Sequence, residues 1–146
     1  MKKSLIPAAV AALMLGGAAP AGNSTKPAPP NGCAVCLEKR PILDPKLFAK
    51  GYEAEAPVGY RIAREIPATL DLLHCFCECK ESQVFRHKTL LTCFADNHAA
   101  GCGICLREAL MAADLKKQGL PDGQIEALVE SSFKTDGHAS TAGRGK

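Results

Sequence analysis

The 146-residue sequence lacks a strong excess of charge of either sign. Lysine and arginine number 18, and aspartate and glutamate number 15. Domains that bind nucleic acid or anionic membranes usually carry a pronounced basic patch, which such a balance does not supply. The composition therefore predicts neither a nucleic-acid partner nor a polybasic membrane surface.

The sequence also lacks an apolar run long enough to cross a bilayer. The apolar segment from Leu5 to Leu15 is too short for a membrane span. It follows the basic start Met1–Ser4 and precedes small residues at Ala19–Ala21, a pattern that a signal peptidase reads. We therefore predict a signal peptide over residues 1–21 and no membrane span after its cleavage. The mature protein is expected to be exported, either periplasmic or extracellular.

Alternation of apolar and polar residues, which would indicate strands, is not present over a useful length. Apolar residues recur instead at helical spacing, which predicts helices over 58–66, 67–73, 84–94, 104–117 and 121–133. Pro67 suits the first turn of the second helix, and Gly119 suits the C-terminal cap of the fourth. We predict a small all-α, cysteine-rich domain over residues 33–134. A Pro-rich flexible linker over 22–32 precedes it, and a disordered tail over 135–146 follows.

What the chain does contain is a dense group of thiols and imidazoles. Six of its eight cysteines and three of its four histidines lie between positions 74 and 105. Cys75, Cys77 and Cys79 alternate, so an extended segment would place the three sulfurs on one side. A disulfide within this triple would be strained, whereas one metal ion can satisfy all three sulfurs from a single point. The triple favours a metal site over long-range disulfides.

A second pair, Cys102 and Cys105, stands where the fourth predicted helix begins. Thiols at a helix N-terminus feel the positive end of the helix dipole, which lowers their pKa and favours the thiolate. The thiolate is both the metal-binding form and the nucleophilic form, so this pair suits metal binding and disulfide exchange equally. His98 joins the same face only if the helix extends back past Gly101.

The remaining candidates have a structural interpretation beside the functional one. His87 shares a helical stripe with Val84, Leu91 and Phe94, so it is either a metal ligand or a core histidine. Cys93 is either a small buried side chain or a member of the thiol group, and the number of neighbouring thiols favours membership.

Cys33 and Cys36 stand at the edge of the folded part, where a disulfide, within the pair or to the core, is the simplest interpretation in an oxidising compartment.

Taken together, these segments resemble exported bacterial proteins known for a PCYCGC (CYCXC) motif. The resemblance runs from Tyr60 to Phe133 and rests on YRIAREIP at Tyr60, CFCEC at Cys75, HKTLLTCF at His87, HAAGCGIC at His98 and GLPDGQI at Gly119. It implies an exported cysteine-rich domain more than a particular activity. Some members of the family are described as selenoproteins, which implies redox use of at least one thiol.

The sequence departs from the family motif at three positions. His74 stands where proline is usual, Phe76 replaces tyrosine, and Glu78 replaces glycine. His74 is either an added ligand or a tolerated surface residue. The loss of proline and glycine leaves the geometry of the turn open.

Three functions remain from the sequence. The first is binding of a soft metal, Cu(I) or Zn²⁺, because thiolate with some imidazole suits both ions. The second is thiol–disulfide exchange with a redox partner, although the βαβ context of thioredoxin-like proteins is missing. The third is a structural or binding domain held by disulfides. No general base or open coordination position indicates hydrolysis. The predicted metal ligands are Cys75, Cys77, Cys79, His87, Cys93, His98, Cys102 and Cys105.

Overall fold

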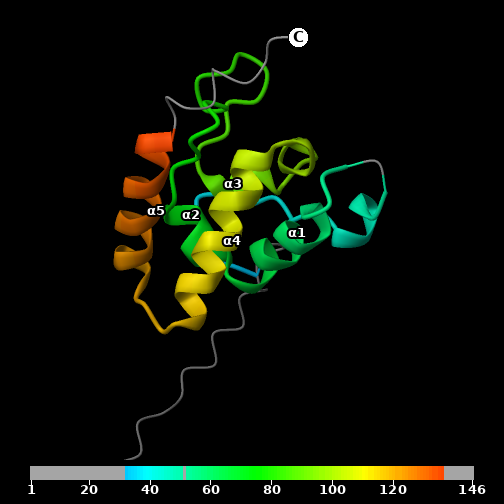
Figure 1. Cartoon of the computed structure of the whole chain (residues 1–146). Coiled ribbons are helices and arrows are strands. Elements are labelled where there is room, and N and C mark those ends of the chain that lie inside the picture. Colours follow the sequence, from blue (N-terminus) through cyan, green and yellow to red (C-terminus); the bar gives the residue numbers. More distant parts are fainter. Residues whose placement is uncertain (1–31, 51, 137–146) are drawn as a thin grey trace, which may run out of the picture.

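The computed structural model describes residues 32–50 and 52–136, and every regular element among them is helical (Figure 1). These residues form η1 (Pro45–Phe48), α1 (Ala56–Glu65), α2 (Pro67–Leu72), α3 (Leu90–Cys93), η2 (His98–Gly101), α4 (Gly103–Lys117) and α5 (Asp122–Asp136). The all-α prediction is confirmed. None of the described helices has the length and apolar character needed to cross a membrane. The predicted signal peptide, all of the predicted linker except Gly32, and residues 137–146 of the predicted tail lie outside the described residues. The first two residues of that tail, Thr135 and Asp136, are not disordered but belong to α5.

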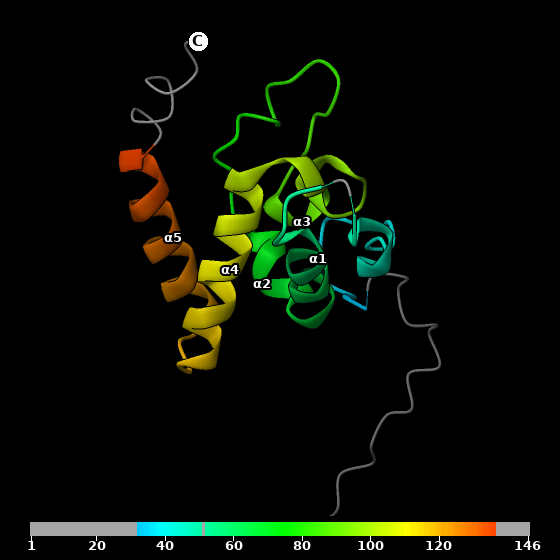
Figure 2. The ribbon, with the colours of Figure 1, turned by 45° about the vertical axis from the view of Figure 1, so that its right-hand side comes forward.

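Helix α4 occupies the middle of the molecule, with α1 packed on one side and α5 on the other (Figures 1 and 2). The core between α1 and α4 contains aromatic rings in contact. Tyr60 of α1 stacks on Phe48 of η1, with ring centroids 4.0 Å apart, and meets Phe94 edge-on at 5.1 Å. The Tyr60 hydroxyl donates a hydrogen bond to the carbonyl of Asp96 at 2.5 Å. This contact fixes the chain just before η2.

The helix ends follow from proline and glycine as the sequence predicts. Pro67 ends α1 and occupies the first turn of α2, since proline fixes φ and lacks the N–H that an internal helical position would need. At the end of α4, Gly119 has a φ of +85°, and its N–H donates to Lys116 O at 3.0 Å. The Leu120 N–H donates to Leu115 O at 3.3 Å, which completes a Schellman cap.

The predicted helix over 84–94 is wrong for its first six residues. Only Leu90–Cys93 is helical, and Val84 is 82% exposed instead of lying on a buried stripe. Arg86 has a φ of +53°, which interrupts a right-handed helix, and Thr89 is extended and caps α3 through its side chain. The segment between α2 and α3 is therefore a loop, drawn in green at one end of Figure 2.

The start of the described chain is fastened to α2. Cys33 and Cys36 form a disulfide with each other, so the pairing within the pair is the one observed. Just after it, the backbone N–H groups of Leu37 and Glu38 donate to the Asp71 carboxylate of α2. The hydroxyl of Thr89 donates to the same carboxylate at 3.1 Å. Asp71 thus joins the first segment, α2 and the cap of α3.

Close packing between α1 and α4 yields a first prediction. A Cβ at Gly59 would lie 2.5 Å from Leu106 Cδ2 and 3.2 Å from Phe94 Cε1, and both neighbouring side chains are buried. We expect Gly59→Ala to lower the free energy of unfolding by about 1–3 kcal/mol, as overpacked core substitutions do. Gly123→Ala in α5 is the matched control, because no atom lies within 4 Å of its Cβ position. Equal denaturation midpoints for the two variants would contradict the packing described.

Candidate metal centre

The eight predicted ligand residues come from four separate segments that meet at one end of α4. The loop after α2 carries Cys75 to Cys79 and His87, α3 ends at Cys93, and η2 begins at His98. Cys102 is the N-cap residue of α4, and Cys105 lies in its first turn. All six of these cysteines are free thiols. Ligand atoms from the eight residues fall into groups within 4.8 Å of one another, so these groups could hold a metal ion.

The CFCEC run is a turn, so the extended conformation in which alternation would align the three sulfurs is not the one observed. Residues 76–80 form turns and a bend, and Glu78 has a φ of +62°. The sulfurs of Cys75, Cys77 and Cys79 nevertheless lie within 4.8 Å of one another, and those of Cys75 and Cys77 are 3.3 Å apart. The left-handed residue curls the backbone around the sulfurs, which brings them together without strand alternation. This explains why glycine suits the position that Glu78 fills here.

The left-handed φ of Glu78 yields a second prediction. Left-handed backbone costs a residue with a Cβ about 1–2 kcal/mol, whereas glycine adopts it freely at some cost in unfolded-state entropy. Because the Glu78 side chain is exposed, little packing would be lost. We expect Glu78→Gly to raise the free energy of unfolding by about 0.5–1 kcal/mol. Lys80→Gly, at an exposed residue without a positive φ, is expected to lower it; a loss in both variants would contradict the turn geometry.

On the α4 side, sulfur atoms and one imidazole lie close together. Cys105 Sγ is 3.4 Å from Cys75 Sγ and 3.7 Å from Cys77 Sγ. His98 Nε2 is 3.3 Å from Cys77 Sγ, although α4 begins only at Gly103 and does not extend back to include His98. The imidazole reaches the cluster from η2 instead. Cys102 completes this group with Cys77, His98 and Cys105.

On the side of the cluster away from α4, the thiols of Cys79 and Cys93 lie in contact. Their sulfurs are 3.4 Å apart, and both side chains are buried. Their ligand atoms lie within 4.8 Å of those of His87 and His98. Cys93 is therefore a member of the thiol cluster, which is the alternative that the sequence favoured, and not simply a small buried side chain.

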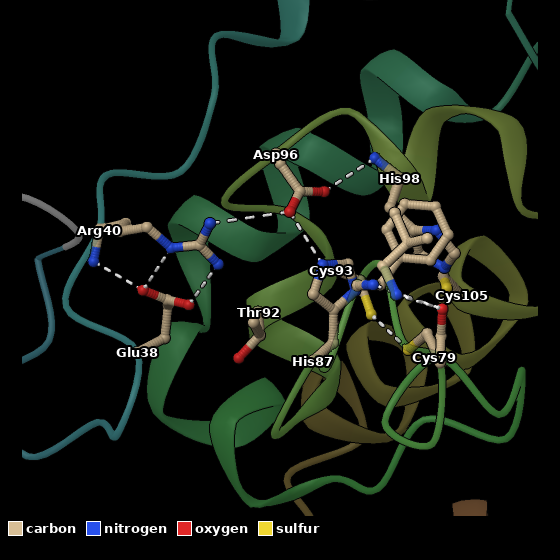
Figure 3. Close-up of polar contacts among 12 residues, drawn as sticks. Glu38, Arg40, Cys79, His87, Thr92, Cys93, Asp96, His98 and Cys105 are labelled. Atoms are coloured by element: carbon tan, nitrogen blue, oxygen red, sulfur yellow. Dashed lines mark hydrogen bonds and ion pairs between the residues drawn. The ribbon is translucent and has the colours of Figure 1, made fainter.

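His87 is held by a polar network that the sequence did not reveal (Figure 3). Its Nε2 lies 2.8 Å from the Asp96 carboxylate, whose other oxygen accepts the His98 N–H at 2.9 Å. Arg40 lies 3.7 Å from Asp96 and also pairs with Glu38. His87 Nδ1 is buried and has no hydrogen-bond partner among the described residues. A metal-binding histidine typically donates its other ring N–H to a carboxylate, which is the arrangement seen here.

The thiols titrate as a connected group. Hydrogen bonds from Cys102, Cys105 and Cys75 lower the pKa of Cys77, because donors favour the thiolate that accepts them. The pKa of Cys75 is raised by its hydrogen bonds to Cys105 and then Cys77. These directions favour the thiolate at Cys77 and the neutral thiol at Cys75 in the protein without metal.

The prediction of a lowered pKa at the helix start is wrong for Cys102. Its hydrogen bond with Cys105 lowers the pKa, but Cys77 and burial raise it, and the net shift is upward. A negative charge already held at Cys77 disfavours a second one beside it. The helix N-terminus supports the cluster, but the acidic thiol belongs to the CFCEC turn.

Glu108, like Asp96, is a residue near the site that the sequence did not reveal. It lies one turn beyond Cys105 on α4 and is fully buried. Its Oε1 accepts the Phe76 N–H at 2.7 Å, which ties the CFCEC turn to α4. Burial raises its pKa to about 7, partly offset by the Phe76 N–H and the Cys75 thiol. A charged residue on the face of Cys105, Ala109 and Ala112 was the available signal.

His74, Cys33 and Cys36 lie outside the ligand groups found in the described part of the chain. His74 is exposed and packs edge-on against Phe76, with ring centroids 5.0 Å apart. Phe76 itself faces Phe133 of α5. The structure thus favours the interpretation of His74 as a surface residue.

The spacing of the donors suits tetrahedral coordination. A zinc site with Zn–S of about 2.3 Å and Zn–N of about 2.0–2.1 Å places sulfurs about 3.8 Å apart and sulfur and nitrogen about 3.6 Å apart. The observed contacts of 3.7 Å between Cys77 and Cys105 and 3.3 Å between Cys77 and His98 are close to these values. Small outward movements would accommodate an ion without refolding the site.

Comparison with known proteins gives one match. A family model described as a protein of unknown function with a PCYCGC motif matches residues 43–143, which is more than half of the chain. No curated protein and no solved structure gives a significant match.

Proposed function

This chain belongs to the family of proteins of unknown function with a PCYCGC motif, and from its own site we propose that it binds a soft metal ion, Cu(I) or Zn²⁺. The family resemblance inferred from the sequence is confirmed, but the family description assigns no activity. One observation carries the proposal: six free thiols and two imidazoles converge at ligand spacing. Thiolate and imidazole donors suit both ions by their softness.

The proposal places the protein outside the cytoplasm. The signal-peptide pattern over residues 1–21 supports export. The Cys33–Cys36 disulfide supports an oxidising compartment, because disulfides persist there and are rare in the cytosol. Six clustered thiols would be vulnerable to oxidation in such a compartment, and a bound soft metal would protect them.

The test is a joint count of metal and thiols. The exported protein is purified without reductant and under anaerobic conditions, bound metals are measured, and free thiols are counted after denaturation. We expect stoichiometric zinc or copper with six reduced cysteines. Metal-free protein in which the cluster cysteines are oxidised and resist glutathione would overturn the proposal and favour the structural disulfide domain.

A second candidate, thiol–disulfide exchange, is favoured by the half-buried Cys77 and its lowered pKa. The Cys77 thiolate would attack a partner disulfide and release one partner thiolate. Cys75 or Cys105 would then displace the second, leaving a new disulfide here and a reduced dithiol on the partner. This assignment replaces Cys102 with Cys77 as the attacking thiol. Metal-free protein with one reducible pair involving Cys77 would support it.

A further inference from the structure

We infer that the centre holds two metal ions of unequal accessibility, an outer ion that exchanges with ligands in solution and an inner ion that the fold retains. This inference rests on the proposed function. The eight donors divide into two complete sets of three sulfurs and one nitrogen. The outer set is Cys77, His98, Cys102 and Cys105, whose ligand atoms all lie within 4.8 Å of one another. We assign the other four donors, Cys75, Cys79, His87 and Cys93, to the inner set, in which the ligand atoms of Cys79, His87 and Cys93 lie within 4.8 Å of one another.

His98 lies within 4.8 Å of donors of both sets, and its half-buried position and its contact with Cys77 assign it to the outer one. His98 Nε2 is 3.3 Å from Cys77 Sγ, and the ligand atoms of the whole outer set lie within 4.8 Å of one another. The inner set is built on Cys79 and Cys93, 3.4 Å apart, with His87 in the same 4.8 Å group.

Cys75 completes the inner set. Its sulfur lies within 4.8 Å of those of Cys79 and Cys93. It is also 3.3 Å from Cys77 and 3.4 Å from Cys105, which belong to the outer set. The two sets therefore adjoin at Cys75, and the centre is compact enough for two neighbouring ions.

Burial differs sharply between the sets. In the outer set, Cys77, His98 and Cys102 are only half-buried, and Cys105 alone is enclosed. In the inner set every residue is at most 3% exposed. A thiol or chelator from solution can approach the outer ligands directly, whereas the inner ligands become accessible only when the surrounding structure opens. The outer position suits exchange with small thiols or with soft-ligand carriers.

The inner set has an independent sign of a ligand in His87 Nδ1. This nitrogen is buried and has no hydrogen-bond partner among the described residues, which is costly for a polar atom. The Nε2 contact with the Asp96 carboxylate places the ring proton on Nε2, so Nδ1 presents a lone pair. Arg40 lies 3.7 Å from the same carboxylate. Asp96 is therefore a positioning residue for the inner ion.

The experiment follows the release of zinc. The purified full chain is loaded anaerobically with Zn²⁺, freed of excess metal, and mixed with pyridylazoresorcinol. We expect two equivalents, one released at least about tenfold more slowly than the other because release requires local opening. Cys102→Ser should remove the fast equivalent and leave the slow one.

Asp96→Asn tests the inner ion while keeping the side-chain volume. The asparagine oxygen still accepts the His98 N–H, so its amide nitrogen donates to His87 Nε2 and shifts the ring proton to Nδ1, which can then no longer bind metal. We expect the slow equivalent to be lost or released at the fast rate. Asp114→Asn, at an exposed aspartate elsewhere on α4, should change neither phase. Circular dichroism verifies that each variant is folded.

The outcomes separate the two claims. A single bound equivalent, two equivalents released in one phase, or loss of the same equivalent in both Cys102→Ser and Asp96→Asn would overturn the partition while leaving metal binding intact. Failure of the wild-type chain to retain any zinc or copper would overturn the proposed function itself.

Discussion

Removal of the proposed metal ion should lower the melting temperature of the protein by about 15–30 °C. An ion present at about a thousand times its dissociation constant stabilises the folded state by about 4 kcal/mol. For a domain of about 100 residues, each kcal/mol corresponds to about 4–8 °C. The ligands come from the loop after α2, α3, η2 and α4, so an ion would link these four segments in addition to their own packing.

The metal-free protein should still fold. The hydrogen bond with Cys105 raises the pKa of Cys75, and the hydrogen bond with Cys102 raises the pKa of Cys105. These two buried thiols therefore stay neutral and pack as small apolar side chains. The measurement is thermal unfolding by far-ultraviolet circular dichroism, under anaerobic conditions, with and without a strong chelator.

A matched control removes the other pair of cysteines. The double variant Cys33→Ser, Cys36→Ser loses the disulfide, which lies outside the ligand groups of the described residues. It should have a lower melting temperature in both conditions and keep the full dependence on metal. Equal melting temperatures of the wild-type protein with and without chelator would show that the cluster does not stabilise the fold through a metal.

Much of the fold could be predicted because its signals are local. Pro67 sets the boundary between α1 and α2, and Gly119 provides the left-handed residue of a Schellman cap. The error over 84–89 has a physical cause. Apolar spacing alone predicted a helix there, but Arg86 adopts a left-handed φ and the Thr89 side chain caps α3, so the backbone turns before the helix begins.

The membership of the cluster could be predicted, but its internal arrangement could not. Spacing gave the CFCEC triple and the helix-start pair as two parts of one site. Which sulfur faces which depends on a left-handed turn at Glu78 and on the position of η2, and neither has a signal in the spacing. The lowered pKa of Cys77 likewise arises from its hydrogen bonds with Cys102 and Cys105 at the start of α4. The sequence had predicted the lowered pKa for that helix-start pair itself.

Asp96 and Glu108 show a different limit. Asp96 looks like one surface carboxylate among many, yet its contact with His87 determines which ring nitrogen is free. Glu108 falls on a helical face with Cys105 and Ala109, which marks it as buried, but its contact with the Phe76 N–H comes from a distant segment. Residues that orient ligands are recognised by contact and not by spacing.

Replacing Glu108 by glutamine should stabilise the metal-free protein at neutral and higher pH and have little effect in acid. Burial raises the pKa of Glu108 to about 7, against an ordinary value of 4.5. Between these values the folded protein binds a proton that the unfolded chain does not, so the free energy of unfolding falls as pH rises. The loss is complete above about pH 7 and amounts to about 3 kcal/mol.

Glutamine avoids this loss because it cannot ionise and its oxygen still accepts the Phe76 N–H. Urea denaturation of both metal-free proteins across the pH range measures the difference, which should grow from near zero below about pH 4.5 to about 3 kcal/mol above about pH 7. Glu65→Gln, at an exposed carboxylate of α1, should give a difference that is small at every pH. A difference for Glu108→Gln that does not change with pH would mean that Glu108 is ionised or neutral throughout, and that burial does not govern its charge. Because the same carboxyl lies beside Cys75, its ionisation above about pH 7 also disfavours negative charge on the thiol cluster before a cation binds.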